Sequence, residues 1–86
     1  MRKIVQEVAG EGLESLLGER VILLCANYFY AGILAGVNTD DVLLDEASIV
    51  YETGPWGQKS WSDSQAVGFP LYVRTQAIEA YGRAGK

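Results

Sequence analysis

The fold is decided by two apolar runs, VILLCA at 21–26 and YFYAGILAGV at 28–37, which flank Asn27. The first run is short, continuous and rich in strand formers, which is typical of a strand covered on both faces. Asn27 suits a tight turn because asparagine readily adopts the left-handed backbone conformation. Gly32 and Gly36 lie inside the second run and indicate the sharp bend of a small barrel. We therefore expect two neighbouring strands in a strongly bent sheet.

The segments after this pair predict a mainly β domain. Turn chemistry at 38–41 precedes a third strand at 42–51. Residues 52–70 contain glycines, prolines and serines, so we expect a long loop or an irregular hairpin there. Two short strands follow at 71–74 and 77–81. The last five residues are expected to be a frayed tail.

The N-terminal segment 3–17 predicts an amphipathic helix. Its apolar residues fall in rows spaced by four, as on one face of a helix. Gly10 and Gly12 weaken this helix by about 1 kcal/mol each relative to alanine, so it depends on docking against the rest of the domain. Gly18 is a suitable C-terminal stop.

Length and composition predict one small domain that depends on association. A chain of 86 residues holds a single core. Cys25 is the one cysteine and the chain has no histidine, so neither an intramolecular disulfide nor a common zinc site is available. Pairing with other subunits is the remaining means of stabilising so small a core.

Charge and hydropathy exclude several classes of function. No apolar run approaches the ~18 residues that span a bilayer. Polar residues interrupt the N-terminal apolar positions, so we expect no signal peptide and a cytoplasmic location. The net charge of −4 repels nucleic acid as a whole, and RNA binding therefore requires a local site.

The residues needed for catalysis are not found in a recognisable arrangement. The chain has no histidine to act as a general base, and no serine or cysteine has an evident activating partner. It also has no glycine-rich phosphate loop. Asp45, Glu46 and Glu52 could suggest a carboxylate metal site, but neighbouring strand residues face opposite ways, so only a loop would bring them together. We expect no enzymatic activity, no cofactor and no metal.

Three fragments, taken in order, resemble the Sm-like (LSm) family. They are YAGILAG at 30–36, VLLDEA at 42–47, and VRT at 73–75 followed by Ile78. The first is similar to the family's spaced tyrosine, glycine, leucine and glycine. The second is similar to its aliphatic triplet before two acids and an alanine, and the third to its isoleucine, arginine and glycine. The long loop resembles those of phage-encoded and metagenomic members.

The resemblance implies one Sm-like domain over residues 1–86. It consists of an N-terminal α-helix at 3–17 and a small, five-stranded, strongly bent Sm-like (SH3-like) barrel. The barrel divides into a first Sm motif at 19–51, the long loop at 52–70 and a second motif at 71–81. The resemblance further implies a cyclic homo-oligomer of about five to seven subunits, in which edge strands pair between neighbours and so avoid aggregation.

The resemblance also implies that two loops near the pore bind single-stranded RNA. The candidate residues are Asn38, Thr39, Asp40 and Asp41 in the first loop, and Arg74 and Thr75 in the second. Asp41 stands where the family has a base-reading asparagine, and a carboxylate lacks the donor of an amide and repels phosphate. Thr75 stands where the family has a glycine, which leaves less space for a base.

Two sets of side chains keep two interpretations each. Arg74 either stacks on a base or pairs with phosphate, or it forms an ion pair with Asp41 or Asp40 and leaves no RNA site. Trp56, Lys59 and Trp61 either stack on unpaired bases beside a cation, or pack in the core or an interface. For the tryptophans we prefer core or interface packing.

Two functions follow from these expectations. The first is a homo-oligomeric Sm-like ring that binds single-stranded RNA near its pore, and Arg74 favours it. The second is a structural or adaptor ring that has lost RNA binding and binds protein partners, in a phage particle or a phage-modified complex of a bacterial host. The acidic loop favours the second function. Neither function involves a membrane.

Overall fold

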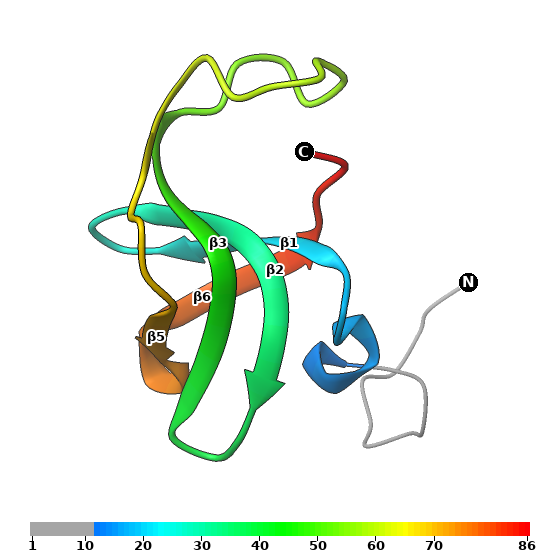
Figure 1. The fold of residues 1–86 in the computed structure, drawn as a ribbon, viewed down its shortest axis with the longest axis vertical. Coiled ribbons are helices and arrows are strands. Elements are labelled where there is room, and N and C mark those ends of the chain that lie inside the picture. The colour runs from blue at the N-terminus through cyan, green and yellow to red at the C-terminus, as the bar shows by residue number, and fades with distance from the viewer. Residues whose placement is uncertain (1–11) are drawn as a thin grey trace.

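The computed structural model describes residues 12–86, which form six β-strands and two short 3-10 helices (Figure 1). The strands are β1 (Arg20–Cys25), β2 (Phe29–Val37), β3 (Asp41–Glu52), β4 (Asp63–Ala66), β5 (Leu71–Arg74) and β6 (Ile78–Arg83). The helices are η1 (Leu13–Leu16) and η2 (Thr75–Ala77). All six strands belong to one antiparallel sheet. The predicted mainly β fold is therefore confirmed.

The sheet has the order β4-β3-β2-β1-β6, and β5 also pairs with β3. Residues 41–44 of β3 pair with β5, whereas residues 48–52 pair with β4. β4 and β5 are thus two pieces along the same edge of β3, and β6 lies beside β1 at the other end of the sheet. Figure 1 shows β2 and β3 curving together. The sheet is open, because within residues 12–86 no strand pairing joins β5 to β6.

The irregularity predicted at Gly32 is present as a β-bulge between β2 and β3. The pairing shifts between Ala31 and Ile33, and Glu46 has a φ of 49°. A Cβ at Gly32 would lie 2.7 Å from the carbonyl oxygen of Asp45. Glycine is required here because the two backbones approach too closely for any side chain. A bulge bends its strand and increases the local twist, which lets β3 reach both β4 and β5.

Alternate residues of β1 serve two apolar clusters on its opposite faces. The larger cluster contains Val21, Leu23, Cys25, Leu34, Val42, Leu44, Ala47 and Val73. The smaller one contains Ile22, Ala31, Val50 and Ala84. This confirms the prediction that β1 is covered on both faces. Burying an aliphatic side chain of this size stabilises the fold by about 1.5 to 3 kcal/mol, so β1 is the centre of the domain.

The predicted α-helix at 3–17 is corrected where the structure describes it. Residues 3–11 lie outside the described residues, and the remainder forms only the one-turn helix η1. Gly12 has a φ of 83° and Leu17 is extended, so the helical conformation is interrupted on both sides. Leu13 and Leu16 pack against the larger cluster, which confirms that this segment docks on the core. Gly18, with a φ of 85°, follows the turn as predicted.

The predicted long loop at 52–70 is corrected as well, because it contains β4. The sheet accordingly has six strands rather than five. All four side chains of β4, in the segment DSQA, are exposed. The strand is held by backbone pairing to β3 and has no buried face, so its sequence lacks the apolar alternation that marks a strand. The irregular hairpin, the second expectation for this segment, describes it better.

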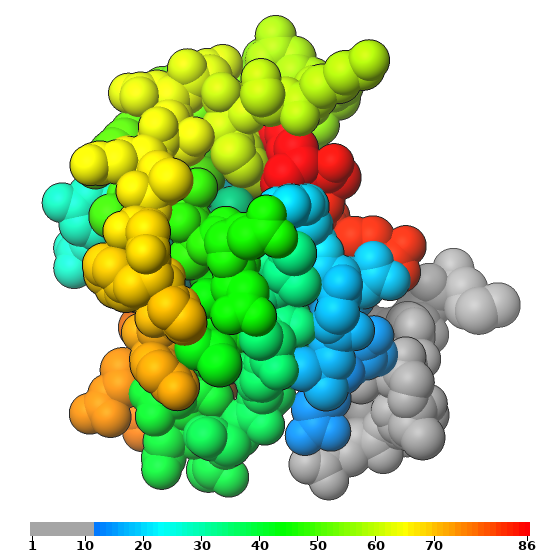
Figure 2. Space-filling view, in the orientation of Figure 1, coloured from blue at the N-terminus to red at the C-terminus, as the bar shows by residue number. Residues whose placement is uncertain are grey.

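The predicted frayed tail is also wrong in the structure. β6 extends to Arg83, and the amide of Ala84 donates to the carbonyl of Arg20 at 2.9 Å. Ala84 is buried in the smaller cluster. Figure 2 shows the C-terminal residues lying against the loop that joins β3 to β4.

Among the helices that the structure describes, none has the length and apolar character needed to cross a membrane.

Candidate functional site

The two loops predicted to form the RNA site lie together at one end of β3. Asp41 and Arg74 are directly paired across β3 and β5. The amide of Thr75 donates a 2.8 Å hydrogen bond to the carbonyl of Asp40, and the Thr75 hydroxyl lies 3.5 Å from the carbonyl oxygen of Asn38. Backbone pairing therefore fixes the second loop against the first.

Asn38 organises the first loop. Its side-chain Oδ1 accepts hydrogen bonds from the amides of Asp40 at 2.9 Å and Asp41 at 2.8 Å. Its own amide donates to the carbonyl of Asp41 at 3.0 Å. Such a turn holds its backbone through one short side chain. Asn38 is therefore a positioning residue, while Thr39 and Asp40 are left exposed at the tip.

The side chain of Arg74 is exposed at the edge of this loop pair. Two ion pairs are formed within residues 12–86, Arg20 with Glu46 at 3.2 Å and Arg83 with Glu19 at 3.6 Å. Arg74 takes part in neither, so the ion pair with an aspartate of the first loop is not formed in the described part of the chain. The guanidinium group keeps its planar set of donors toward solvent.

A groove of about 550 Å³ begins at Arg74 and extends between β5, η2 and the β1–β2 turn. Its ring-bearing lining residues are Tyr28, Tyr30 and Tyr72, and Tyr72 is 68% exposed. Tyr72 and Arg74 are two positions apart on β5, so they share a face, while Val73 is buried on the other face. The alternation in the segment LYVR is the signal that places Tyr72 beside Arg74.

Two protonated groups line the inner wall of this groove. Burial, and secondarily the charge of Glu79, raises the pKa of the Cys25 thiol. Burial likewise raises the pKa of Tyr30, with smaller contributions from Cys25 and Tyr28. Both groups therefore carry their protons at neutral pH, and Cys25 is not an activated nucleophile. The groove offers ring faces for stacking and hydrogen-bond donors, which suit the binding of a ligand rather than catalysis.

The tryptophan loop, residues 53–62, lies at the other end of β3 from Arg74 (Figure 1). Trp56 and Trp61 make an edge-to-face contact with ring centroids 6.0 Å apart. Trp61 packs against the smaller cluster, whereas Trp56 is 59% exposed. The cation over the Trp61 ring is Lys86, whose Nζ lies 4.4 Å from the ring centroid, and Lys59 is exposed. Sequence analysis missed Lys86, because it is distant in sequence from the loop it contacts.

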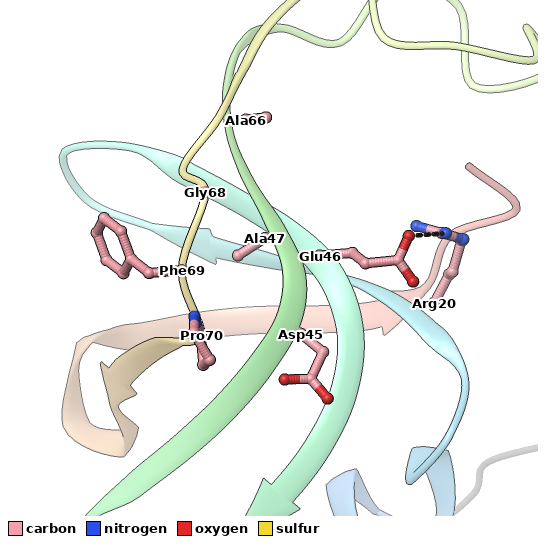
Figure 3. A pocket seen from close by; sticks show the side chains of 8 residues that line it. All are labelled: Arg20, Asp45, Glu46, Ala47, Ala66, Gly68, Phe69 and Pro70. Atoms are coloured by element: carbon pink, nitrogen blue, oxygen red, sulfur yellow. Dashed lines mark hydrogen bonds and ion pairs between the residues drawn. The ribbon is translucent and has the colours of Figure 1, made fainter.

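The carboxylates at the β3 bulge lie beside a separate hollow of about 530 Å³ (Figure 3). Glu46 turns toward Arg20, with which it is ion-paired, and Asp45 points away from that pair. The remaining lining comes mainly from the connection between β4 and β5, including Phe69 and Pro70. Within residues 12–86 no group of three or more histidine, cysteine, aspartate or glutamate side chains is arranged to hold a metal ion.

Comparisons with known proteins add no relative to this description: no family model matches the chain, and neither a curated protein nor a solved structure matches it significantly.

Proposed function

We propose that this chain is an Sm-like subunit that forms a closed homo-oligomeric ring of about five to seven copies and binds single-stranded RNA at Arg74. The strand order supports the proposal. If β4 and β5 count as one interrupted strand along β3, the sheet has the five positions expected of an Sm-like barrel. The interrupted strand is then the family's fourth and β6 its fifth.

The two free edges of the sheet support assembly. β4 and β5 pair only with β3 in the described chain, and β6 pairs only with β1. Large aromatic side chains are exposed along these edges and beside them, namely Phe69, Tyr72 and Tyr81. Unpaired edges with exposed apolar groups favour association, and a head-to-tail ring pairs all of them.

One observation carries the RNA part of the proposal: Arg74 is exposed, takes part in neither described ion pair, and is held on a loop pair fixed by backbone hydrogen bonds. A ring repeats this guanidinium around its axis. Guanidinium groups stack on bases and pair with phosphates, and Tyr72 adds a ring face on the same side of β5.

A second candidate function is an adaptor ring that binds a protein partner. It is favoured by Asp40 and Asp41, whose carboxyl groups belong to the same loop pair as Arg74. Carboxylates repel phosphate, and the net charge of −4 adds to that repulsion. A basic or hydrogen-bonding protein surface would meet no such penalty at this loop.

Native mass spectrometry with and without a uridine-rich oligonucleotide tests both parts of the proposal. We expect one closed oligomer that gains RNA. Arg74→Ala should weaken binding roughly tenfold, because a charge-assisted hydrogen bond is lost. Arg83→Ala, which removes an equal charge from β6, is the matched control and should have little effect. Added salt should weaken binding of the unmodified chain.

The remaining outcomes are equally informative. A closed oligomer that ignores RNA would favour the adaptor function, and binding unaffected by Arg74→Ala would exclude the site proposed at Arg74. A monomer at micromolar concentration would contradict the Sm-like assignment itself.

A further inference from the structure

A second groove, of about 210 Å³, gathers most of the positive charge of the described chain. Residues 12–86 contain five lysines and arginines, and three of them, Arg20, Lys59 and Lys86, line this groove. Glu46 is the one carboxylate in the lining. The groove therefore carries a net charge of about +2 in a chain of net charge −4, which points to an anionic ligand.

The neutral part of the lining suits an oxyanion. Three serine hydroxyls, those of Ser48, Ser60 and Ser64, come from β3, the tryptophan loop and β4. Each hydroxyl can rotate to donate a hydrogen bond. Trp61 provides an apolar wall. Cations, rotatable donors and one indole are the groups that hold a phosphate beside a sugar or base.

Lys86 is held in place before any ligand arrives. Its Nζ donates to the carbonyl of Pro55 at 3.0 Å and lies 3.4 Å from the carbonyl oxygen of Thr53. The ring of Trp61 lies beneath it at 4.4 Å. An ammonium group has three donors, so two carbonyls leave one for a further acceptor. A fixed cation loses less conformational entropy on binding than a free lysine does.

Arg20 is also partly fixed. One of its terminal nitrogens contacts Glu46 at 3.2 Å (Figure 3), and the fork of a guanidinium group carries five N–H donors in total. Glu46 stands at the β3 bulge with its positive φ, and both partners of this ion pair line the groove. Donors remain on Arg20 for a second anion.

We propose that this groove binds a phosphate group, with Arg20, Lys59 and Lys86 as counter-charges and the serine hydroxyls as additional donors. The phosphate belongs either to an RNA backbone or to a free phosphate monoester. Only the RNA source rests on the proposed function, since Arg74 lies at the opposite end of β3.

Trp61 serves as the reporter in a test with the full chain. Trp56→Phe leaves Trp61 as the single tryptophan, whose fluorescence is followed during titration with inorganic phosphate, uridine monophosphate or a uridine-rich oligonucleotide. We expect a saturable change with at least one phosphate-bearing probe. Lys59→Ala should lower the affinity for that probe about tenfold, because one charge-assisted contact is lost. Lys59 is exposed, so its removal should leave the fold intact.

Arg83→Ala is the control for charge alone, because Arg83 is exposed and outside the groove lining. An equal loss in both variants would overturn the proposal, as would the lack of a saturable response to all three probes. A response to uridine monophosphate or phosphate assigns the site to free phosphates. A response to the oligonucleotide alone, lost in Lys59→Ala and retained in Arg74→Ala, assigns it to the RNA backbone. Phosphate binding by a chain that fails to form a ring separates this site from the proposed function.

Discussion

The two halves of β3 hold their neighbours by different means. Residues 41–44 pair with β5, bury Val42 and Leu44 completely, and lead into a turn tied by backbone hydrogen bonds. Residues 48–52 pair with β4, whose side chains are all exposed, and lead into the tryptophan loop. Part of that loop is held by a single side chain, that of Lys86.

The two ends of β3 therefore differ: one is held by backbone pairing and the other by side chains. Backbone pairing over a buried core tolerates changes in surface side chains, so the loop pair at Arg74 is a preformed site. The tryptophan loop is held through two half-buried side chains: Trp61 packs against the smaller cluster, and Lys86 contacts two carbonyls and the Trp61 ring. The first end is therefore fixed by main-chain contacts and the second by side-chain contacts.

Gly32→Ala should destabilise both halves of β3, because it disturbs the bulge between them. A Cβ at this position would lie 2.7 Å from the carbonyl oxygen of Asp45 and 3.2 Å from the Cα of Ala47, both backbone atoms that cannot move aside alone. We expect a loss of about 3 kcal/mol in the free energy of unfolding, the upper part of the range for overpacking. Urea denaturation followed by circular dichroism measures it.

Gly36→Ala on the same strand is the control for this substitution. A Cβ at Gly36 would lie 3.6 Å from the Cβ of Leu43, an ordinary contact. We expect a change within about 0.5 kcal/mol of the unmodified chain. Equal destabilisation by the two substitutions would show that glycine flexibility, rather than close approach at the bulge, is what β2 requires.

Truncating one residue in β5 and one in β4 compares what the two strands contribute to the free energy of unfolding. Val73→Ala removes two methyl groups from the larger cluster and should cost about 2 kcal/mol in unfolding free energy. Ser64→Ala on β4 alters an exposed side chain and should change stability by less than about 0.5 kcal/mol. Thermal unfolding of both variants gives the comparison. Similar losses in both would mean that β4 is buried in the assembled protein.

The same contrast explains which parts of the fold could be predicted from the sequence. The runs at 21–26 and 28–37 predicted β1 and β2 because their buried faces leave an apolar pattern. β4 leaves none, since all four of its side chains are exposed and backbone pairing to β3 holds the strand in the sheet. A strand without a buried face has no hydrophobic period, so it was predicted as part of a loop.

The candidate residues show a similar division. The proximity of 38–41 and 74–75 was expected from the resemblance, and Thr75 joins the two loops by donating to the carbonyl groups of Asp40 and Asn38. The contacts of Lys86 depend on a chain end folding back 25 residues or more onto its loop, and no local pattern encodes such a contact. Contacts between residues far apart in the sequence are therefore the part of a site that is hardest to predict from a single sequence.

Asn38→Ala should destabilise the chain less than Gly32→Ala or Val73→Ala does, and it tests the turn beside Arg74. The substitution removes the Oδ1 that accepts from the amides of Asp40 and Asp41, and we expect a loss of about 1 kcal/mol, with faster amide hydrogen exchange in the turn. Asn38→Asp keeps the oxygen that accepts both hydrogen bonds and should retain the stability. Because it adds a negative charge beside Arg74, it should nevertheless weaken the proposed RNA binding. If Asn38→Asp lost stability as Asn38→Ala does, repulsion among the three neighbouring carboxylates, rather than hydrogen bonding, would dominate this turn.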